Sequence, residues 1–229
     1  MNQGFHLAMV LLLALSVAAG AAPEAWPAGY HRYTRDPSVD SPDGTYGFIV
    51  PTNEAYDKGE RCKIVNLKTG APVHTIAHGE YWNEGDGGLS NGGINARWRA
   101  DPAHAGAWRC VIEFEGKWQP RNLTLVELDP TGKSVESDIW GPLEKAAAQH
   151  FHGKVPDKAF NEYYAMLLTE PQIKLEDAVV IEATADSNPK DDAQTDRYTC
   201  PVTARFDIGT KTLQFTPGKL ELRKGTPEK

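Results

Sequence analysis

The sequence predicts an α+β fold that consists mainly of antiparallel β-sheet, carries two short helices and is not closed into a propeller. Three observations lead to this expectation. In the first half of the chain, apolar residues recur at every second position in short segments; in the middle they recur at helical spacing; and near the C-terminus the period of two returns. Strands before and after a helical segment are typical of domains whose helices cover one face of an antiparallel sheet.

Short strands are expected throughout the first half of the domain. Turn sequences at Pro42–Gly44, Lys68–Gly70 and Asp129–Gly132 separate them, as in consecutive hairpins. The expected strands are Tyr46 to Val50, Cys62 to Leu67, Val73 to Ala77, Ile94 to Arg99, Trp108 to Phe114 and Leu123 to Leu128.

Residues 142–170 are expected to form a helical segment. Apolar residues recur every four positions behind Pro142, which suits the first helical position, so a first helix is predicted over Pro142–His152. A second helix is predicted from Asp157, a suitable N-cap, to the residues just before Pro171. Antiparallel strands are expected to fill residues 173–223, with segments at Val179 to Ala183, Tyr198 to Ile208, Lys211 to Phe215 and Leu220 to Leu222.

Residues 1–21 are expected to form a cleavable signal peptide, and residues 22–229 a single β-rich domain. The nearly unbroken apolar run from Leu7 to Ala19 is shorter than the roughly 20 residues of a spanning helix, and small residues typical of a cleavage site follow it. We therefore expect a periplasmic or extracellular protein without stable membrane insertion after cleavage. Because no Lys or Arg precedes the apolar run, a retained N-terminal anchor is the alternative.

The charge balance argues against two classes of partner. The chain has 24 Lys and Arg residues against 31 Asp and Glu residues, which gives a formal net charge of −7. No cluster of basic residues is present. Nucleic acids and anionic lipid surfaces both require a positive surface, so neither is an expected partner.

The three cysteines, Cys62, Cys110 and Cys200, lie far apart and have no metal-ligand spacing. Each lies on the apolar side of a period-2 pattern, which predicts burial. In an oxidising compartment we expect Cys62 and Cys110 to form a disulfide, because both belong to the first β half and have matching phase. Cys200 is then expected to stay buried and unpaired.

No metal, cofactor or catalytic residue is predicted. His74 and His78 are four residues apart in a strand and its turn, and that spacing supports a joint zinc site only on a helix. The acidic segment from Asp186 to Asp196 lacks the Gly and the distal Glu of a calcium loop. No G-x-S-x-G motif is present, and no base can be assigned to a serine such as Ser90.

Two segments share a common plan. Ser-Pro-Asp-Gly at 41–44 precedes an apolar strand, and a second strand leads into 65–70; segments 97–102 and 125–132 repeat the plan with Ala-Asp-Pro in place of the first turn. Residues 36–135 thus resemble, in part, the blade repeat of exported β-propeller proteins. Since a propeller needs at least four blades, the resemblance implies two blade-like hairpin units and not a ring. The whole chain also resembles small exported bacterial proteins without an assigned activity, which supply no functional residues.

The sequence predicts an exported binding or interaction domain for an unknown exported protein or small molecule. The Gly-rich segment 85–93 buries little side chain and is expected to be accessible to a partner. Tryptophans on either side of this segment are expected to supply apolar contact area, with core packing as the alternative. An arginine whose side chain lies on the opposite side of its strand from the core residues could orient an acidic group. A small extracytoplasmic hydrolase whose carboxylates meet only in the fold is the alternative function. The candidate binding residues are Trp82, Gly87, Gly88, Arg97 and Trp118.

Overall fold

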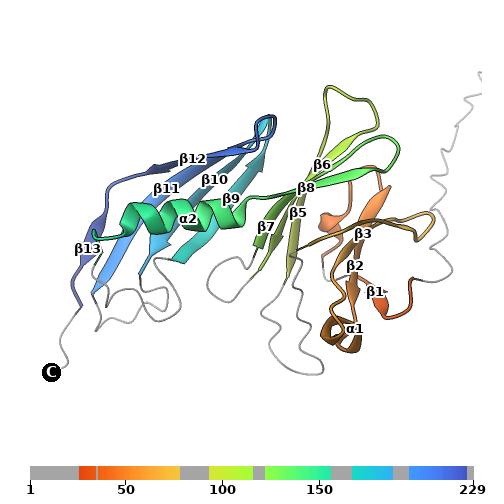
Figure 1. Cartoon of the computed structure of the whole chain (residues 1–229), viewed down its shortest axis with the longest axis horizontal. Helices are drawn as coiled ribbons and strands as arrows, with labels where there is room; N and C mark the ends of the chain where they lie inside the picture. The colour runs from red at the N-terminus through yellow and green to blue at the C-terminus, as the bar shows by residue number, and fades with distance from the viewer. Residues whose placement is uncertain are drawn as a thin grey trace, which may run out of the picture.

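A computed structural model of the chain describes residues 26–34, 36–77, 93–115, 122–155, 167–187 and 196–225. These residues form three antiparallel sheets with two α-helices, and none of the sheets is closed (Figure 1). The predicted mainly-β α+β class is therefore confirmed. Within the described residues, no helix is both long enough and apolar enough to cross a membrane.

The first sheet has the strand order β1-β2-β3-β4. The Ser-Pro-Asp-Gly turn leads into it: the Asp43 carboxylate accepts hydrogen bonds from Ser41 and Thr45, and Gly44 adopts a φ of 68° that favours glycine. Thr52 caps a short helix by accepting the backbone N–H of Ala55. The elements are β1 (Tyr30–Arg32), a 3-10 turn (Pro37–Val39), β2 (Tyr46–Pro51), α1 (Asn53–Asp57), β3 (Lys63–Asn66) and β4 (Pro72–Thr75).

The second sheet is a meander of four strands in the order β5-β6-β7-β8. Asp129 closes the turn between the last two strands, because its carboxylate accepts the backbone N–H groups of Thr131 and Lys133. The strands are β5 (Ile94–Ala100), β6 (Trp108–Phe114), β7 (Asn122–Leu128) and β8 (Ser134–Asp138). The last of them was not predicted, since its residues are mostly polar.

The third sheet has five strands, and α2 lies across one face of it (Figure 1). The buried residues Leu143, Ala147 and Phe151 of α2 have the four-residue spacing from which the first helix was predicted. The elements are α2 (Trp140–Phe151), β9 (Leu167–Leu175), β10 (Ala178–Asp186), β11 (Arg197–Asp207), β12 (Thr212–Pro217) and β13 (Glu221–Arg223).

The second predicted helix is wrong at its C-terminal end. Its start at Asp157 lies outside the described residues, but residues 167–170 belong to β9, which pairs with β10. Pro171 does not end this strand, because β9 is an edge strand and its register with β10 shifts between Glu182 and Thr184, opposite the proline. A proline is tolerated at such an edge bulge. The second short helix of the structure is α1.

Two hydrophobic cores lie on opposite faces of the second sheet. The N-terminal core packs the first sheet against one face; it includes Phe48, Ile64, Cys110, Ile112 and Val126. The C-terminal core packs the opposite face against α2 and the third sheet; it includes Val111, Leu125, Leu143, Phe151 and Phe206. The second sheet thus contributes to both cores.

All three cysteines are described, and none forms a disulfide. The predicted bond between Cys62 and Cys110 is absent, although both side chains are buried in the N-terminal core. The strand phase correctly predicted that both cysteine side chains face the same core, but it does not predict the distance between them. A disulfide also needs Cα atoms within about 7 Å. Burial raises the pKa values of the Cys110 and Cys200 thiols, so both side chains are held as neutral thiols.

We predict that all three thiols survive in protein recovered from an oxidising compartment. Because each is buried, native protein should react slowly with a thiol reagent such as Ellman's reagent, whereas protein unfolded without reductant should release three equivalents. A single reactive thiol after unfolding would show that a disulfide had formed and would contradict the structure.

Candidate functional site

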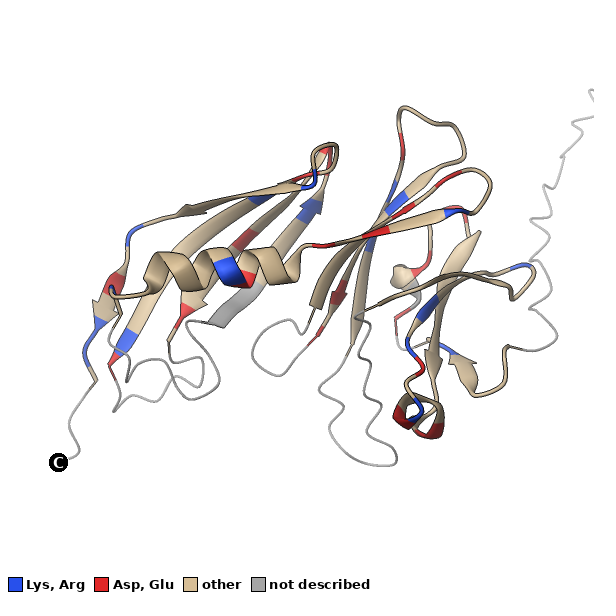
Figure 2. Ribbon diagram, viewed as in Figure 1, with Lys and Arg blue, Asp and Glu red and all other residues tan. Residues whose placement is uncertain are grey.

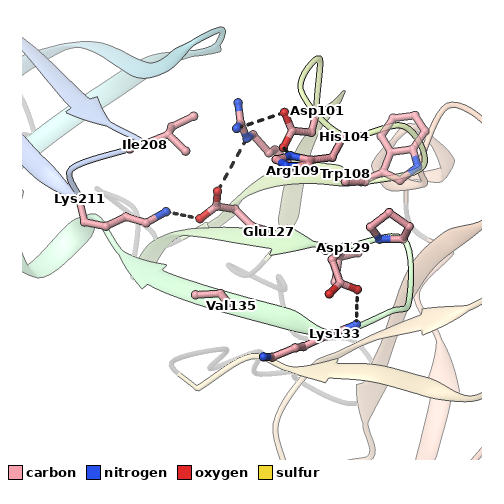
Figure 3. Close-up of a pocket in the computed structure, with 14 residues that line it drawn as sticks. Asp101, His104, Trp108, Arg109, Glu127, Asp129, Lys133, Val135, Ile208 and Lys211 are labelled. Carbon is pink, nitrogen blue, oxygen red and sulfur yellow. Dashed lines mark hydrogen bonds and ion pairs between the residues drawn. The ribbon is translucent and has the colours of Figure 1, made fainter.

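A cleft of about 590 Å³ lies at the junction of the second and third sheets (Figure 3). Two turns of the second sheet and the β11–β12 turn of the third sheet surround it. Its apolar wall includes Trp108, Leu128, Val135 and Ile208. The volume lies within the range of about 300 to 1,000 Å³ that is usual for small-molecule sites. We call it the hairpin cleft.

A chain of opposite charges crosses the hairpin cleft (Figure 3). The Arg109 guanidinium lies between two carboxylates, with Nη2 3.3 Å from Asp101 Oδ1 and Nε 3.8 Å from Glu127 Oε1. Lys211, from the β11–β12 turn, forms an ion pair with Glu127 and thereby connects the second and third sheets. Hydrogen bonds from Ala103 N–H and His104, together with the Arg109 charge, lower the pKa of Asp101, which favours its ionised form.

Lys211 holds its position with an unusual backbone conformation. Its φ of 57° is the one positive value among the non-glycine residues that the structure describes. Such a conformation is uncommon for a residue with a side chain and recurs at binding and switch regions. The turn around it is fixed by Asp207, which accepts hydrogen bonds from Thr210 and from the backbone N–H of Lys211.

Arginines line the same face of the second sheet beyond the cleft. Arg97 and Arg99 lie on β5, and Arg99 is directly opposite Arg109 of β6. Each has an acidic neighbour: Arg97 Nη1 is 3.5 Å from Glu113, and Arg99 Nη2 is 3.2 Å from Asp177. We call these three arginines the arginine face. Figure 2 shows Lys and Arg beside Asp and Glu over this sheet.

Of the predicted binding residues, Arg97 is the one that lies within the described part of the chain. Arg97 faces away from the N-terminal core, against which Trp98 packs, so its predicted orientation is confirmed. Its role in orienting a ligand remains a prediction. The other predicted binding residues, Trp82, Gly87, Gly88 and Trp118, lie outside the described residues.

Glu113 is a buried carboxyl group near the arginine face. Burial raises its pKa above the ordinary range, and the charge of Glu115 adds to this, although Arg97 opposes it. The Asn95 amide nitrogen lies 3.0 Å from Glu115 Oε1 and 3.5 Å from Glu113 Oε2, and so occupies the space between the two carboxyl groups.

A second polar cluster, which we call the edge bridge, consists of His74, Ser134 and Glu136. It joins β4, at the edge of the first sheet, to β8, at the edge of the second. The Nδ1 atom of His74 lies 2.8 Å from Ser134 Oγ, and its Nε2 atom lies 2.9 Å from Glu136 Oε2. The sequence did not predict this cluster, because about sixty residues separate His74 from Ser134 and Glu136. The one available signal was that Ser134 and Glu136 are two residues apart on β8 and therefore share a face of the strand.

The Glu136 carboxylate is held from several sides. The backbone N–H of Ala77 donates to Oε2 and the Thr124 hydroxyl donates to Oε1. These bonds and the one with His74 lower the pKa of Glu136 despite its partial burial. The edge bridge therefore connects two sheets through a carboxylate that is stabilised in its ionised form.

Neither cluster has the composition of a metal centre. Across the described ranges, no three His, Cys, Asp or Glu side chains are grouped so that they could hold a metal ion. His78, considered with His74 as a zinc pair, lies outside those ranges, as do Asp191 and Asp192 of the acidic segment.

Glu113, which is buried, and Glu136, which is half-buried, should affect stability with opposite pH dependence. The raised pKa of Glu113 means that its stabilising contribution is present at low pH and is lost as the pH rises through its folded-state pKa. The lowered pKa of Glu136 means that its contribution is present at neutral pH and is lost as the pH falls through its folded-state pKa. Relative to wild type, Glu113→Gln should therefore gain stability as the pH rises above about 4.3, the ordinary pKa of a Glu side chain. Glu136→Gln should lose stability relative to wild type as the pH rises toward about 4.3, and its deficit should stay constant at higher pH.

Urea unfolding at several pH values measures these differences. Glu221→Gln, at an exposed position of β13, controls for the loss of one charge. If both variants showed the same sign of pH dependence relative to wild type, the assigned environments of the two carboxyl groups would be incorrect.

Comparison with protein-family models, with curated proteins and with solved structures found no match to this chain. Function must therefore be argued from the geometry of its own clefts and charged groups.

Proposed function

We propose that this protein is an exported binding domain that holds a small molecule in the hairpin cleft. One observation supports this above the others: the cleft combines an apolar wall with the ionic chain from Asp101 through Arg109 and Glu127 to Lys211. Small-molecule sites commonly have this composition, with apolar contact area and a few polar groups that fix orientation. The signal-peptide-like N-terminus supports a periplasmic or extracellular location.

The junction between two sheets also suits ligand binding. Lys211 belongs to the third sheet and Glu127 to the second, so a ligand between them would contact both halves of the domain. The turn holds the Lys211 backbone, and the ion pair with Glu127 holds its side chain, which would reduce the entropy lost when a ligand binds.

The geometry favours binding over hydrolysis. The edge bridge has a hydroxyl, an imidazole and a carboxylate in sequence, but the Ser134 hydroxyl also donates to the Val73 carbonyl, 3.3 Å away. A hydroxyl group has one proton, so the proton that Ser134 donates to Val73 is not donated to the imidazole, as activation of a serine nucleophile would require. In the pair Glu113 and Glu115, the Asn95 amide nitrogen donates hydrogen bonds to both carboxyl groups. Both clusters are better explained as structural contacts.

Filling the cleft tests the proposal. Val135 lines the cleft and is 52% exposed, so Val135→Trp should fold normally while its indole occupies the ligand space. A matched control is Leu222→Trp, because Leu222 is 42% exposed on β13 and does not line the cleft. Saturation-transfer NMR against a library of soluble metabolites should give ligands for wild type and Leu222→Trp that Val135→Trp binds at least about tenfold more weakly. Ligands that bind all three proteins equally would place the binding site elsewhere.

A further inference from the structure

We propose that the ligand of the hairpin cleft is an organic anion, and that its carboxylate or phosphate group binds at the arginine face between Arg99 and Arg109. This inference rests on the proposed function, because Arg109 belongs to both the cleft and the arginine face. It goes further in that it names the chemical class of the ligand and the groups that recognise it.

Unsatisfied hydrogen-bond donors mark the arginine face. In the part of the chain that the structure describes, the buried side-chain nitrogen and oxygen atoms without a hydrogen-bond partner are Arg97 Nη1, Arg99 Nη1 and Arg109 Nε. All three are donors, and all three belong to neighbouring residues on one face of β5 and β6. Arg97 Nη1 and Arg109 Nε each lie near a carboxylate, at 3.5 and 3.8 Å, but make no hydrogen bond with it. Buried donors are normally hydrogen-bonded, so these atoms have unused capacity for an acceptor.

Other arginines of the domain show that this is not a general feature of its guanidinium groups. Arg197 donates from Nε to the Asp186 carboxylate at 2.9 Å and forms a second bond through Nη2. Arg32 donates to Asp40 and, at 2.6 Å, to the Phe48 carbonyl. The arginine face thus differs from Arg197 and Arg32 in having buried donor atoms that make no hydrogen bond.

The two arginines that would hold the anion lie directly opposite each other, and each has a carboxylate beside it. Side chains directly opposite each other on antiparallel strands have Cβ atoms about 5 Å apart, and like charges there are destabilising. Arg99 and Arg109 are such a pair, with Arg97 two residues further along β5. An oxyanion between the two guanidinium groups would reverse the sign of this interaction.

The acidic neighbours would permit this exchange. Asp177 has an 84% exposed side chain, so its ion pair with Arg99 is worth little and is easily replaced. Asp101 and Glu127 retain other partners if Arg109 turns to a ligand, since Ala103 and His104 contact Asp101, and Lys211 contacts Glu127. No carboxylate near Arg109 would be left without a partner.

Directed hydrogen bonds, and not net charge, would select the ligand. Acidic residues balance the arginines locally, so a spherical ion such as chloride gains little. A guanidinium group presents a planar set of donors that matches the oxygens of a carboxylate or a phosphate in a bidentate arrangement. We therefore expect oxyanions to bind in preference to halides.

Calorimetric titration with sodium phosphate, and separately with sodium succinate, tests the inference against sodium chloride at equal ionic strength. Arg99→Gln and Arg109→Gln should each weaken binding of the preferred anion at least about tenfold. Arg205→Gln, at an exposed position of β11, should change it less than about twofold and controls for the loss of a positive charge. Stronger binding of phosphate or of succinate distinguishes a phosphorylated ligand from a carboxylic acid.

The Arg109 side-chain Nε–H resonance gives a readout that does not depend on stability. It should shift in the presence of the preferred oxyanion and not with chloride. No binding above the chloride control, or equal binding by wild type, Arg99→Gln and Arg109→Gln, would overturn the anion site. If the anion site failed this test but Val135→Trp still bound metabolites more weakly than wild type, the proposed function would stand without the anion site. If oxyanions bound the arginine face but every metabolite bound Val135→Trp and wild type equally, the cleft proposal would fail and the anion site would stand.

Discussion

Alternate side chains of β6 and β7 pack into different hydrophobic cores, and the rest of the domain depends on this alternation. Cys110, Ile112 and Val126 contribute to the N-terminal core, whereas their neighbours Val111 and Leu125 contribute to the C-terminal core. Because side chains alternate strictly along a strand, a shift of one residue in register would exchange the two sets. The second sheet is therefore fixed from both sides, and it holds the first and third sheets in place.

The candidate site follows from the face that this sheet turns toward the third sheet. Apolar residues on that face pack into the C-terminal core, and charged residues of the same strand phase, including Arg109 and Glu127, continue beyond it. There Lys211 reaches across from the third sheet. Arg109, Glu127 and the two arginines of β5 thus lie on strands, which position them more precisely than a loop could. On the opposite face, polar residues of β8 reach the first sheet through the edge bridge.

The elements that could be predicted from the sequence are those whose apolar residues recur at a regular spacing. Strand β6 was predicted with its observed ends, and α2 was placed within two residues at each end, because their apolar spacing was regular. Strand β8 was missed since its residues are mostly polar, and Pro171 suggested a helix end where an edge strand accommodates it. The candidate site was not predictable in this way. Its charged residues come from separate strands and turns, and only strand pairing brings them together; Arg97 alone was identified in advance, from its phase.

Hydrogen exchange on two core variants tests most directly whether one shared sheet holds both cores. Ile112→Ala removes buried side chain from the N-terminal core and Leu125→Ala from the C-terminal core, and each should cost about 2 to 5 kcal/mol of unfolding free energy. If the second sheet couples the two cores, either substitution should lower the exchange protection of the slowest amides in the first and third sheets by the same free energy. Each variant should also unfold in one cooperative urea transition. Loss of protection confined to the first sheet in Ile112→Ala and to the third sheet in Leu125→Ala would show that the two cores unfold independently and would contradict this account.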